Sequence, residues 1–361
     1  MASMSLTKRR RAAILASAGG LILAAGTLLA AVKSDAIGAA EPAKVRAEAR
    51  TAWLADWQWE AGAADLKAAG ELQSLQVFAA YFDESDRLVF TPEFREGLPA
   101  IRDAAALNGT KHLDLTLVND ILYADGSESQ KDAALVSRLV ASDQSRTKHL
   151  KDVLAAVEMY GFDGVELDYE KVKDADWNKV IRFIADLQVH LKNRGKTLRV
   201  VLETRAPTDK VKLPAGPTYV MMAYNLYGGH SGPGPKADEA YVKQVAKRLA
   251  KLPGDPYVAL AAGGFDWGPS GDVKGVTEQQ AALLAERSMK PPTRDAASGS
   301  LRFDYLDDGG AKHTVWYADG ETLSRWIAAA KSAGRGNIAL WRLGELGDGT
   351  LAMYGVHGKG N

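Results

Sequence analysis

The sequence predicts an α/β protein built on a closed (β/α)8 TIM barrel. Short apolar segments with strand character alternate with amphipathic helical segments after residue 50, which is typical of parallel βαβ units. Eight strand candidates fall within roughly 300 residues, which fits a barrel with insertions. A doubly wound open sheet is the alternative. Its dinucleotide-binding version is disfavoured, because no Gly-x-Gly-x-x-Gly follows the first strand.

Each element is predicted from its periodicity and from the residues that end it. The strand candidates are residues 52–59, 75–82, 113–118, 163–170, 198–203, 219–224, 257–262 and 338–341. Helices are predicted at residues 147–161, 174–193, 237–252 and 321–333. The first helix stops at Gly161. The second has one apolar stripe and is followed by Gly195, as expected for a helix that packs one face against a core.

The segment between the seventh and eighth strand candidates is too long for an ordinary barrel loop. Within it, residues 301–305 and 313–317 have the pattern of a hairpin, joined by an acidic turn with glycine at 307–310. We therefore predict a small insertion over residues 268–318. The barrel domain then spans residues 49–355, with an N-terminal region at 1–48 and a short tail at 356–361.

The N-terminal region has the pattern of an export signal. Basic residues at 8–11 precede an uncharged, apolar run at 12–32, which is about long enough to span a bilayer. We expect a single-pass membrane anchor with a cytoplasmic basic stub and the barrel outside the cytoplasm. A cleaved signal and a secreted or periplasmic protein are the alternative, because small residues follow at 36–40. A buried helix of the fold is disfavoured, because the run lacks polar periodicity.

The composition excludes several kinds of site. The chain has no cysteine, which excludes disulfides, a thiolate nucleophile and cysteine-ligated metals. Lys plus Arg and Asp plus Glu both total 45, so the net charge gives no indication of a nucleic-acid partner. The histidines are scattered without the spacing of metal ligands, and we expect neither a metal nor a cofactor.

The strand candidate 163–170 alternates apolar and acidic side chains. A strand would direct Glu166, Asp168 and Glu170 to one face, with neighbouring carboxylates roughly 6–7 Å apart. At the carboxyl end of a barrel strand, such a face lies where barrel enzymes carry out their chemistry. Closely spaced carboxylates in a partly dry site cannot all ionise, so at least one keeps the proton that a general acid needs. The alternative is the solvated face of an antiparallel sheet.

Residues 163–170, residues 222–225 and Trp341 together resemble glycoside hydrolase family 18, the chitinase-like barrels. Residues 163–170 read Asp-Gly-Val-Glu-Leu-Asp-Tyr-Glu, which resembles the family's Asp-Gly-x-Asp-x-Asp-x-Glu signature. Residues 222–225 read Met-Ala-Tyr-Asn and resemble its Met-x-Tyr-Asp segment on the sixth strand. Trp341 falls where the family has a tryptophan at the end of the eighth strand. The resemblance extends over about residues 50–350, and some segments look like bacterial cell-envelope members, including modules associated with polysaccharide deacetylases.

The resemblance implies retaining hydrolysis of β-1,4-linked N-acetylglucosamine polymers, in which the substrate's own acetamido oxygen acts as nucleophile. Glu170 would protonate the glycosidic oxygen and later activate water. Asp168 would orient the acetamido group and stabilise its positive charge, and Tyr224 would donate a hydrogen bond to the acetamido oxygen. Chitin, poly-N-acetylglucosamine and peptidoglycan all offer this group. The alternative is a non-catalytic protein of the cell envelope that binds amino-sugar polymer.

Further residues are expected to support these groups or to bind sugar. The supporting residues are Asp163, Glu166, Met222 and Asn225, and the sugar-binding candidates are Trp341, Trp267, Asp266, Trp57 and Tyr81. Glu166 and Asn225 stand where the family usually has Asp, so we expect altered proton sharing and an altered pH profile. An indole face packs well against a pyranose ring, whereas burial in the core is the alternative for any single tryptophan.

Overall fold

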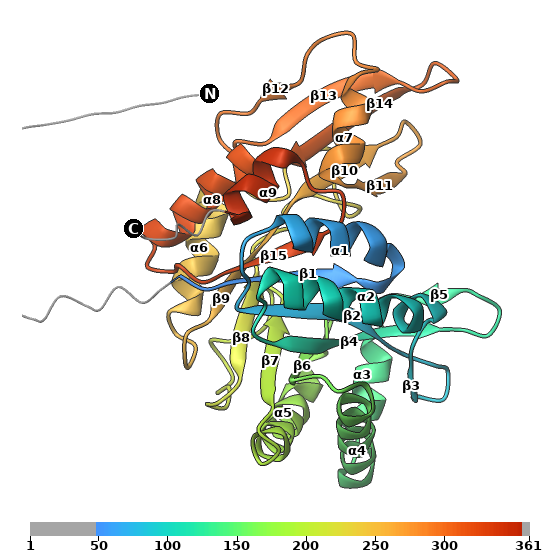
Figure 1. The fold of residues 1–361 in the computed structure, drawn as a ribbon, viewed down its shortest axis with the longest axis vertical. Coiled ribbons are helices and arrows are strands. Elements are labelled where there is room, and N and C mark those ends of the chain that lie inside the picture. The colour runs from blue at the N-terminus through green and yellow to red at the C-terminus, as the bar shows by residue number, and fades with distance from the viewer. Residues whose placement is uncertain (1–47, 356–361) are drawn as a thin grey trace, which may run out of the picture. The chain divides into compact units, whose positions relative to one another are not determined.

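Eight parallel strands close into a barrel. The computed structural model describes residues 48–355, in which the barrel strands follow one another in the order β1, β2, β4, β6, β7, β8, β9 and β15 (Figure 1). Their bounds are β1 Arg50–Ala55, β2 Ser74–Phe82, β4 Leu113–Leu122, β6 Gly164–Asp168, β7 Thr197–Leu202, β8 Thr218–Met222, β9 Tyr257–Ala261 and β15 Ile338–Leu343. β15 pairs with β1, so the predicted closed barrel is confirmed and the open sheet is excluded.

Helices and two short strands complete the barrel domain. The helices are α1 Trp59–Ala68, α2 Pro92–Asn108, α3 Ala133–Leu139, α4 Asp143–Tyr160, α5 Trp177–Lys192, α6 Glu239–Leu249, α8 Gly320–Ser332 and α9 Asp348–Gly355, with 3-10 turns at η1 Asp56–Gln58 and η2 Asp174–Asp176. β3 Leu88–Val89 and β5 Glu128–Ser129 pair antiparallel with β2 and β4. The described residues 203–217, which connect β7 to β8, hold no helix, so this barrel unit departs from the ideal (β/α)8 pattern.

The ends of α4 show how local sequence sets an element. Ser142 N donates to Ser145 Oγ at 2.9 Å, and Ser145 N donates to Ser142 Oγ at 3.1 Å, which forms a capping box. The helix ends at Gly161, whose φ of 63° is a left-handed conformation that glycine adopts without strain. β6 begins three residues later, so this helix end fixes where the acidic strand enters the barrel.

Apolar side chains form one core outside the barrel strands and another inside them. Val165 and Leu260 belong to the outer core, which the helices cover. Trp53, Val220 and Ala259 belong to the inner core. Because the strands are buried on both faces, β2 is buried along its whole length, and polar side chains can face solvent only at the barrel ends.

The insertion is a five-stranded antiparallel sheet with one helix, β11-β10-β14-β13-β12 and α7 (upper part of Figure 1). The bounds are β10 Gly263–Trp267, β11 Val273–Val276, α7 Glu278–Ala285, β12 Thr293–Arg294, β13 Leu301–Leu306 and β14 Lys312–Ala318. The predicted hairpin is present as β13 and β14, but the insertion begins at Gly263 rather than at residue 268. Gly263 has a φ of 63°, and a Cβ on Gly264 would lie 1.7 Å from Trp316 O, so both glycines are needed at this transition.

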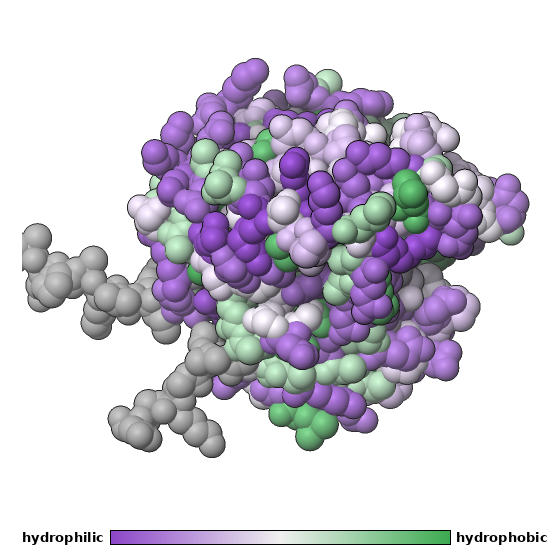
Figure 2. Space-filling view, turned by 90° about the horizontal axis from the view of Figure 1, so that it is seen from above, coloured by the Kyte–Doolittle hydropathy of each residue, from purple (hydrophilic) through white to green (hydrophobic). Residues whose placement is uncertain are grey.

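Two predicted strand ends also differ from the structure. The first strand ends at Ala55, so that Trp57 lies in η1 and Trp59 begins α1. The acidic strand ends at Asp168, so Glu170 lies two residues beyond it. The face shown in Figure 2 is mostly hydrophilic, with small separate hydrophobic areas. Within residues 48–355, no helix is long and apolar enough to cross a membrane, and the predicted anchor at 12–32 lies outside the described residues.

Candidate active site

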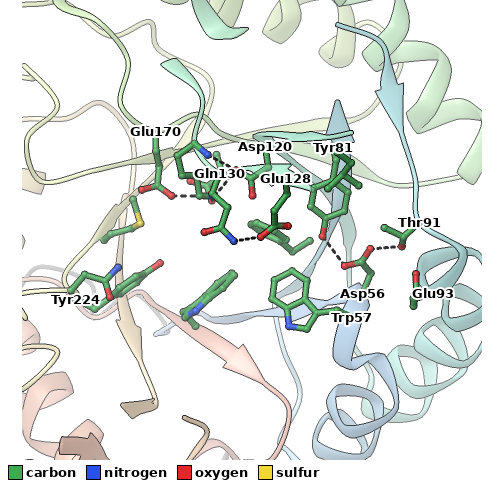
Figure 3. Close-up of a pocket in the computed structure, with 17 residues that line it drawn as sticks. Asp56, Trp57, Tyr81, Thr91, Glu93, Asp120, Glu128, Gln130, Glu170 and Tyr224 are labelled. Carbon is green, nitrogen blue, oxygen red and sulfur yellow. Dashed lines mark hydrogen bonds and ion pairs between the residues drawn. The ribbon is translucent and has the colours of Figure 1, made fainter. Parts of the chain in front are cut away.

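A cavity of about 550 Å³ opens at the carboxyl ends of the barrel strands (Figure 3). Its lining contains the predicted site residues Asp168, Glu170, Met222, Tyr224, Asn225, Trp341, Trp57 and Tyr81. It also contains residues that were not predicted for the site: Asp56, Phe78, Thr91, Glu93, Asp120, Leu122, Glu128, Gln130 and Lys131. Carboxylates and aromatic rings therefore meet in one cavity that opens to solvent.

Glu170 is held in place beyond the end of its strand. The Asn119 side chain binds its backbone on both sides, because Glu170 N donates to Asn119 Oδ1 at 2.9 Å and Asn119 Nδ2 donates to Glu170 O at 3.0 Å. Asn119 is fully buried on the neighbouring strand β4. This double hydrogen bond fixes the point from which the Glu170 side chain enters the cavity.

Lys131 brings a positive charge to the acidic residues. Its Nζ lies 3.2 Å from Glu170 Oε1 and 3.8 Å from both Asp168 Oδ2 and Asp120 Oδ1. Lys131 N also donates to Asp120 Oδ1 at 2.7 Å, which holds the loop after β5 against β4. One ammonium group therefore faces three carboxyl groups.

Burial raises the pKa of each of these three carboxyl groups. For Asp168 the rise is large, because burial and the neighbouring carboxylates outweigh the attraction of Lys131. Burial also raises the pKa values of Glu170 and Asp120, and the charge of Lys131 again opposes the rise. Burial by itself lowers the pKa of Lys131, but the surrounding carboxylates reverse this and raise it. The lysine therefore stays charged at neutral pH, while the carboxyl groups retain protons more readily than exposed ones do.

Glu166 is committed to a buried network deeper in the barrel. Its carboxylate accepts hydrogen bonds from Trp53 Nε1 and from Thr116 Oγ1, the latter at 2.9 Å, and it forms an ion pair with Arg199 Nε at 2.8 Å. Both members of the ion pair are almost inaccessible to solvent. Glu166 does not line the cavity, and its carboxylate is paired with Arg199.

The other supporting residues divide between the two ends of the barrel. Asp163 accepts from Leu113 N at 2.9 Å at the start of β6, so it ties two strands together away from the cavity. Met222, Tyr224 and Asn225 line the cavity at the end of β8. Burial, and secondarily the nearby carboxylates, raises the pKa of Tyr224 well above its usual value, so its hydroxyl remains a hydrogen-bond donor.

Aromatic rings form one side of the cavity. Trp341 packs edge-to-face against Phe78 and Trp53, with centroid distances of 5.3 and 5.9 Å. Trp57 packs against Phe78 at 5.5 Å and is 52% exposed, an unusual exposure for an indole. Trp57 and Trp341 therefore offer apolar surface to the cavity, and their role in sugar binding stays a prediction.

Asp266 and Trp267 lie elsewhere. Asp266 is buried in the insertion sheet, where it accepts from Tyr305 Oη at 2.7 Å and lies 2.9 Å from His313 Nδ1. Trp267 is also buried, and neither residue lines the cavity. Both residues follow the predicted seventh strand, but the turn at Gly263 carries them into β10. We therefore do not retain either residue as sugar-binding in this cavity.

A hydrogen-bonded group of polar side chains lines the cavity near the ends of β1 and β2. Tyr81 Oη donates to Asp56 Oδ1 at 2.7 Å, and Thr91 Oγ1 donates to Asp56 Oδ2 at 2.5 Å. Burial raises the pKa of Asp56, although these hydrogen bonds oppose the rise. Figure 3 shows this group beside Trp57 and Glu93, so polar side chains extend on the side away from Glu170 and Tyr224.

Some of the unpredicted cavity residues could have been recognised from the sequence, and others could not. Asn119 and Asp120 directly follow the predicted third strand, and polar residues after a buried strand are typical of a barrel site. Asp56 follows β1 in the same way, but the run of tryptophans hid the strand end. No sequence pattern singles out Lys131. Within residues 48–355, no three His, Asp or Glu side chains are grouped as metal ligands, and the absence of a metal stays a prediction.

A family model supplies the decisive comparison. The model for the glycosyl hydrolases family 18 matches residues 126–345, a range that contains Asp168, Glu170, Tyr224 and Trp341. The chain belongs to family 18. The range covers more than half of the chain and extends through β6, β8 and β15, which are three of the strands that line the cavity.

Individual family 18 proteins are similar to this chain at low sequence identity. The cortical fragment-lytic enzyme of Bacillus anthracis is 26% identical over 233 residues, which are 59% of this chain and 53% of that protein. The chitinase from Chromobacterium violaceum matches with a TM-score of 0.71 and 19% identity over 85% of this chain and 98% of that one. The Bacillus cereus spore cortex-lytic enzyme SleL matches with a TM-score of 0.68 and 22% identity over 85% of this chain and 73% of that one.

These similarities support different statements. The structural matches, at such low identities, show that the chain shares the family 18 barrel fold. The chain spans 53% of the length of the Bacillus anthracis enzyme and 61% of the length of a second curated relative. Each of those proteins is therefore considerably longer than the part that matches.

Proposed function

We propose that the protein hydrolyses β-1,4 or related glycosidic bonds in N-acetylglucosamine-containing polysaccharide, with retention and with the substrate's acetamido group as nucleophile. The observation that carries the proposal is the meeting of Asp168, Glu170 and Tyr224 in one cavity at the carboxyl ends of the barrel strands. Family 18 membership and the names of relatives, which include chitinases and cortex-lytic enzymes, support the same chemistry.

Each of the three residues suits its proposed role. Glu170 has a raised pKa, which favours the protonated acid that delivers a proton to the leaving oxygen. Asp168 Oδ1 is buried without a hydrogen-bond partner in the described residues, so it is free to accept the acetamido N–H. Tyr224 keeps its hydroxyl proton and donates a hydrogen bond to the acetamido oxygen. The acetamido oxygen then attacks the anomeric carbon, and Glu170 later removes a proton from the incoming water.

The proposal extends to the polymer and its location. Trp57 and Trp341 would stack against sugar rings on either side of the scissile bond, which favours a polymer over a single sugar. We place this activity in the cell envelope, outside the cytoplasm, on the basis of the sequence pattern at residues 8–32 alone. A chitinase-like or endo-β-N-acetylglucosaminidase specificity is the form of activity that we propose.

Substitution of the proposed acid tests this function. Glu170→Gln should lower kcat on N-acetylglucosamine oligomers by about 100- to 10,000-fold, because the amide cannot transfer a proton. Glu96→Gln, on the exposed side of α2, is the matched control and should leave kcat unchanged. Full activity of the Glu170→Gln protein would contradict the assignment. Binding of oligomers by the wild-type protein without turnover would instead indicate a non-catalytic sugar-binding protein.

A further inference from the structure

A second cavity of about 520 Å³ adjoins the acidic one and has a different charge. Trp57, Asn225 and Trp341 line both cavities, so a polymer that passes these residues leaves one and enters the other. The lining of the first cavity includes six acidic residues and one lysine. The second, between the strand ends and the insertion, contains the cations Lys236 and Arg342. The charge of the lining therefore changes from acidic in the first cavity to basic in the second, and Trp57 and Trp341 lie where the two cavities meet.

Arg342 has no carboxylate within ion-pair distance in the described part of the chain. Its guanidinium lies 5.3 Å from the centroid of the Trp57 ring, and its Nη1 donates to Leu343 O at 3.3 Å. Because the ring covers one face of the guanidinium, its edge remains for an acceptor in the same plane. A carboxylate fits this edge with two parallel hydrogen bonds. Gly344 makes room for the group, since a Cβ there would lie 2.8 Å from Arg342 Nη1.

The acidic side chains around Arg342 are committed to other donors. Asp65 Oδ2 accepts two backbone N–H groups at 2.7 and 3.0 Å, and Glu345 Oε2 accepts two side-chain donors at 2.8 and 2.6 Å. Glu278 also lines the cavity, but burial raises its pKa and favours its neutral form. Within residues 48–355, Glu345 and Asp65 are near enough to act on the charge of Arg342, but neither forms an ion pair with it.

Lys236 is a second cation without a carboxylate partner among the described residues. Its Nζ donates to Ala262 O at 3.0 Å and lies 5.0 Å from the centroid of the Phe265 ring. Burial, together with the nearby charge of Arg342, lowers the pKa of Lys236 to about 7. An anion in the cavity would stabilise the charged lysine, which otherwise has only a carbonyl and a ring to offset its burial.

We propose that this second cavity binds a carboxylate carried by a sugar next to the scissile bond, so that the preferred substrate is an acidic, N-acetylated glycan. The inference rests on the proposed function, because it places the carboxylate on the same polymer that the acidic cavity cleaves. A neutral chitin chain would leave both cations without a partner. A chain whose sugars carry a carboxyl group, such as a lactyl ether, supplies that partner.

The test compares two glycans that differ only in this group. One consists of peptide-free strands of alternating N-acetylglucosamine and N-acetylmuramic acid. The other consists of the same strands with the lactyl carboxyl reduced to an alcohol. The wild-type protein should have a kcat/KM about tenfold or more higher for the carboxylated strands, the difference expected for a charge-assisted hydrogen bond. This comparison needs no variant, so it stands even where a substitution impairs folding.

Variants then assign the preference to the cavity. Lys236→Met and Arg342→Gln should each lower the ratio of kcat/KM between carboxylated and reduced strands by about threefold, and the double variant should remove the preference. Lys274→Met is the matched control, because it removes a lysine on the exposed side of β11 that does not line the cavity. It should keep the wild-type ratio. Unchanged ratios in the two cavity variants would overturn the assignment.

The outcomes separate this inference from the proposed function. Equal hydrolysis of both glycans by the wild-type protein overturns the carboxylate site and leaves hydrolysis standing. If N-acetylglucosamine oligomers are cleaved but neither strand is, the carboxylate site is overturned and hydrolysis stands. If none of the three is cleaved, the proposed function is overturned. In that case calorimetric titration with short fragments of the two strands still decides the carboxylate site. Tighter binding of the carboxylated fragment supports it, and equal binding overturns it.

Discussion

The ammonium of Lys131 lies 3.2 Å from Glu170 Oε1, which joins a cation to the proposed general acid. The two residues are 39 positions apart in the sequence and come from different loops of the barrel. The contact opposes the rise in the pKa of Glu170 that burial produces. Lys131 is therefore placed to set the pH at which the acid loses its proton.

Lys131→Met should move the alkaline limb of the pH dependence of kcat/KM upward. Removing the cation leaves burial less opposed, so Glu170 stays protonated to a pH about one to three units higher. The measurement is kcat/KM on N-acetylglucosamine oligomers across the pH range. Lys173→Met, which removes an exposed lysine from the same side of the barrel, serves as control and should keep the wild-type profile. An unshifted limb in Lys131→Met would show that the ion pair does not tune the acid.

Asn119→Ala should lower kcat more than it changes KM. The substitution removes both hydrogen bonds to the Glu170 backbone, and a displaced acid loses roughly 10- to 100-fold in rate. It should also cost about 1–3 kcal/mol of unfolding free energy. Asn108→Ala is a matched control, because Asn108 Nδ2 donates to three backbone carbonyls. A similar loss of stability with unchanged kcat is expected there, and equal kcat losses in both variants would contradict the positioning role.

Arg199→Met should destabilise the barrel strongly. It leaves Glu166 as a buried carboxylate without its cation, which costs about 3–5 kcal/mol. The double variant Arg199→Met with Glu166→Leu should recover most of this loss, because an apolar pair of similar volume needs no counter-charge. Urea denaturation of the wild-type, single and double variants measures the three free energies. A double variant no more stable than Arg199→Met would contradict this explanation.

Asp168→Asn should stabilise the protein at pH 8 but not at pH 4. The pKa of Asp168 in the folded protein lies well above its ordinary value of 3.8. The stability that comes from its protonated form is therefore fully present at pH values below 3.8. It is lost as the pH rises through the raised pKa of the folded state. Asparagine avoids this loss, and Tm should rise by about 2–4 °C at pH 8. Asp103→Asn, on the exposed side of α2, should show no such pH-dependent gain.

The positions of the strands were predictable because a strand that is buried on both faces is a run of mostly apolar residues. Residues 75–82 and 257–262 are runs of apolar residues, and they form β2 and β9 nearly as predicted. The ends of the strands were less predictable. Nothing in the run Trp53 to Trp59 indicates that η1 begins at Asp56, since the decisive contacts of Asp56 are with Tyr81 and Thr91 from later segments.

The candidate site was predictable where its residues lie on one strand. The alternation in residues 163–170 assigned Glu166, Asp168 and Glu170 to one face because side-chain direction along a strand follows directly from residue spacing. The same alternation did not separate the roles of Glu166 and Asp168. That separation comes from Arg199 on the adjacent strand β7, which pairs with Glu166 alone.

The sequence by itself determined the order of strands and helices, the insertion hairpin and the common face of Asp168 and Glu170, because each depends on residues close together in the chain. Only the tertiary structure decided that Asn119 holds Glu170, that Lys131 faces it, and that Lys236 and Arg342 share a cavity. These groups come from separate strands and loops. Closure of the barrel brings them within reach of one another, and no local pattern encodes a contact between segments that far apart.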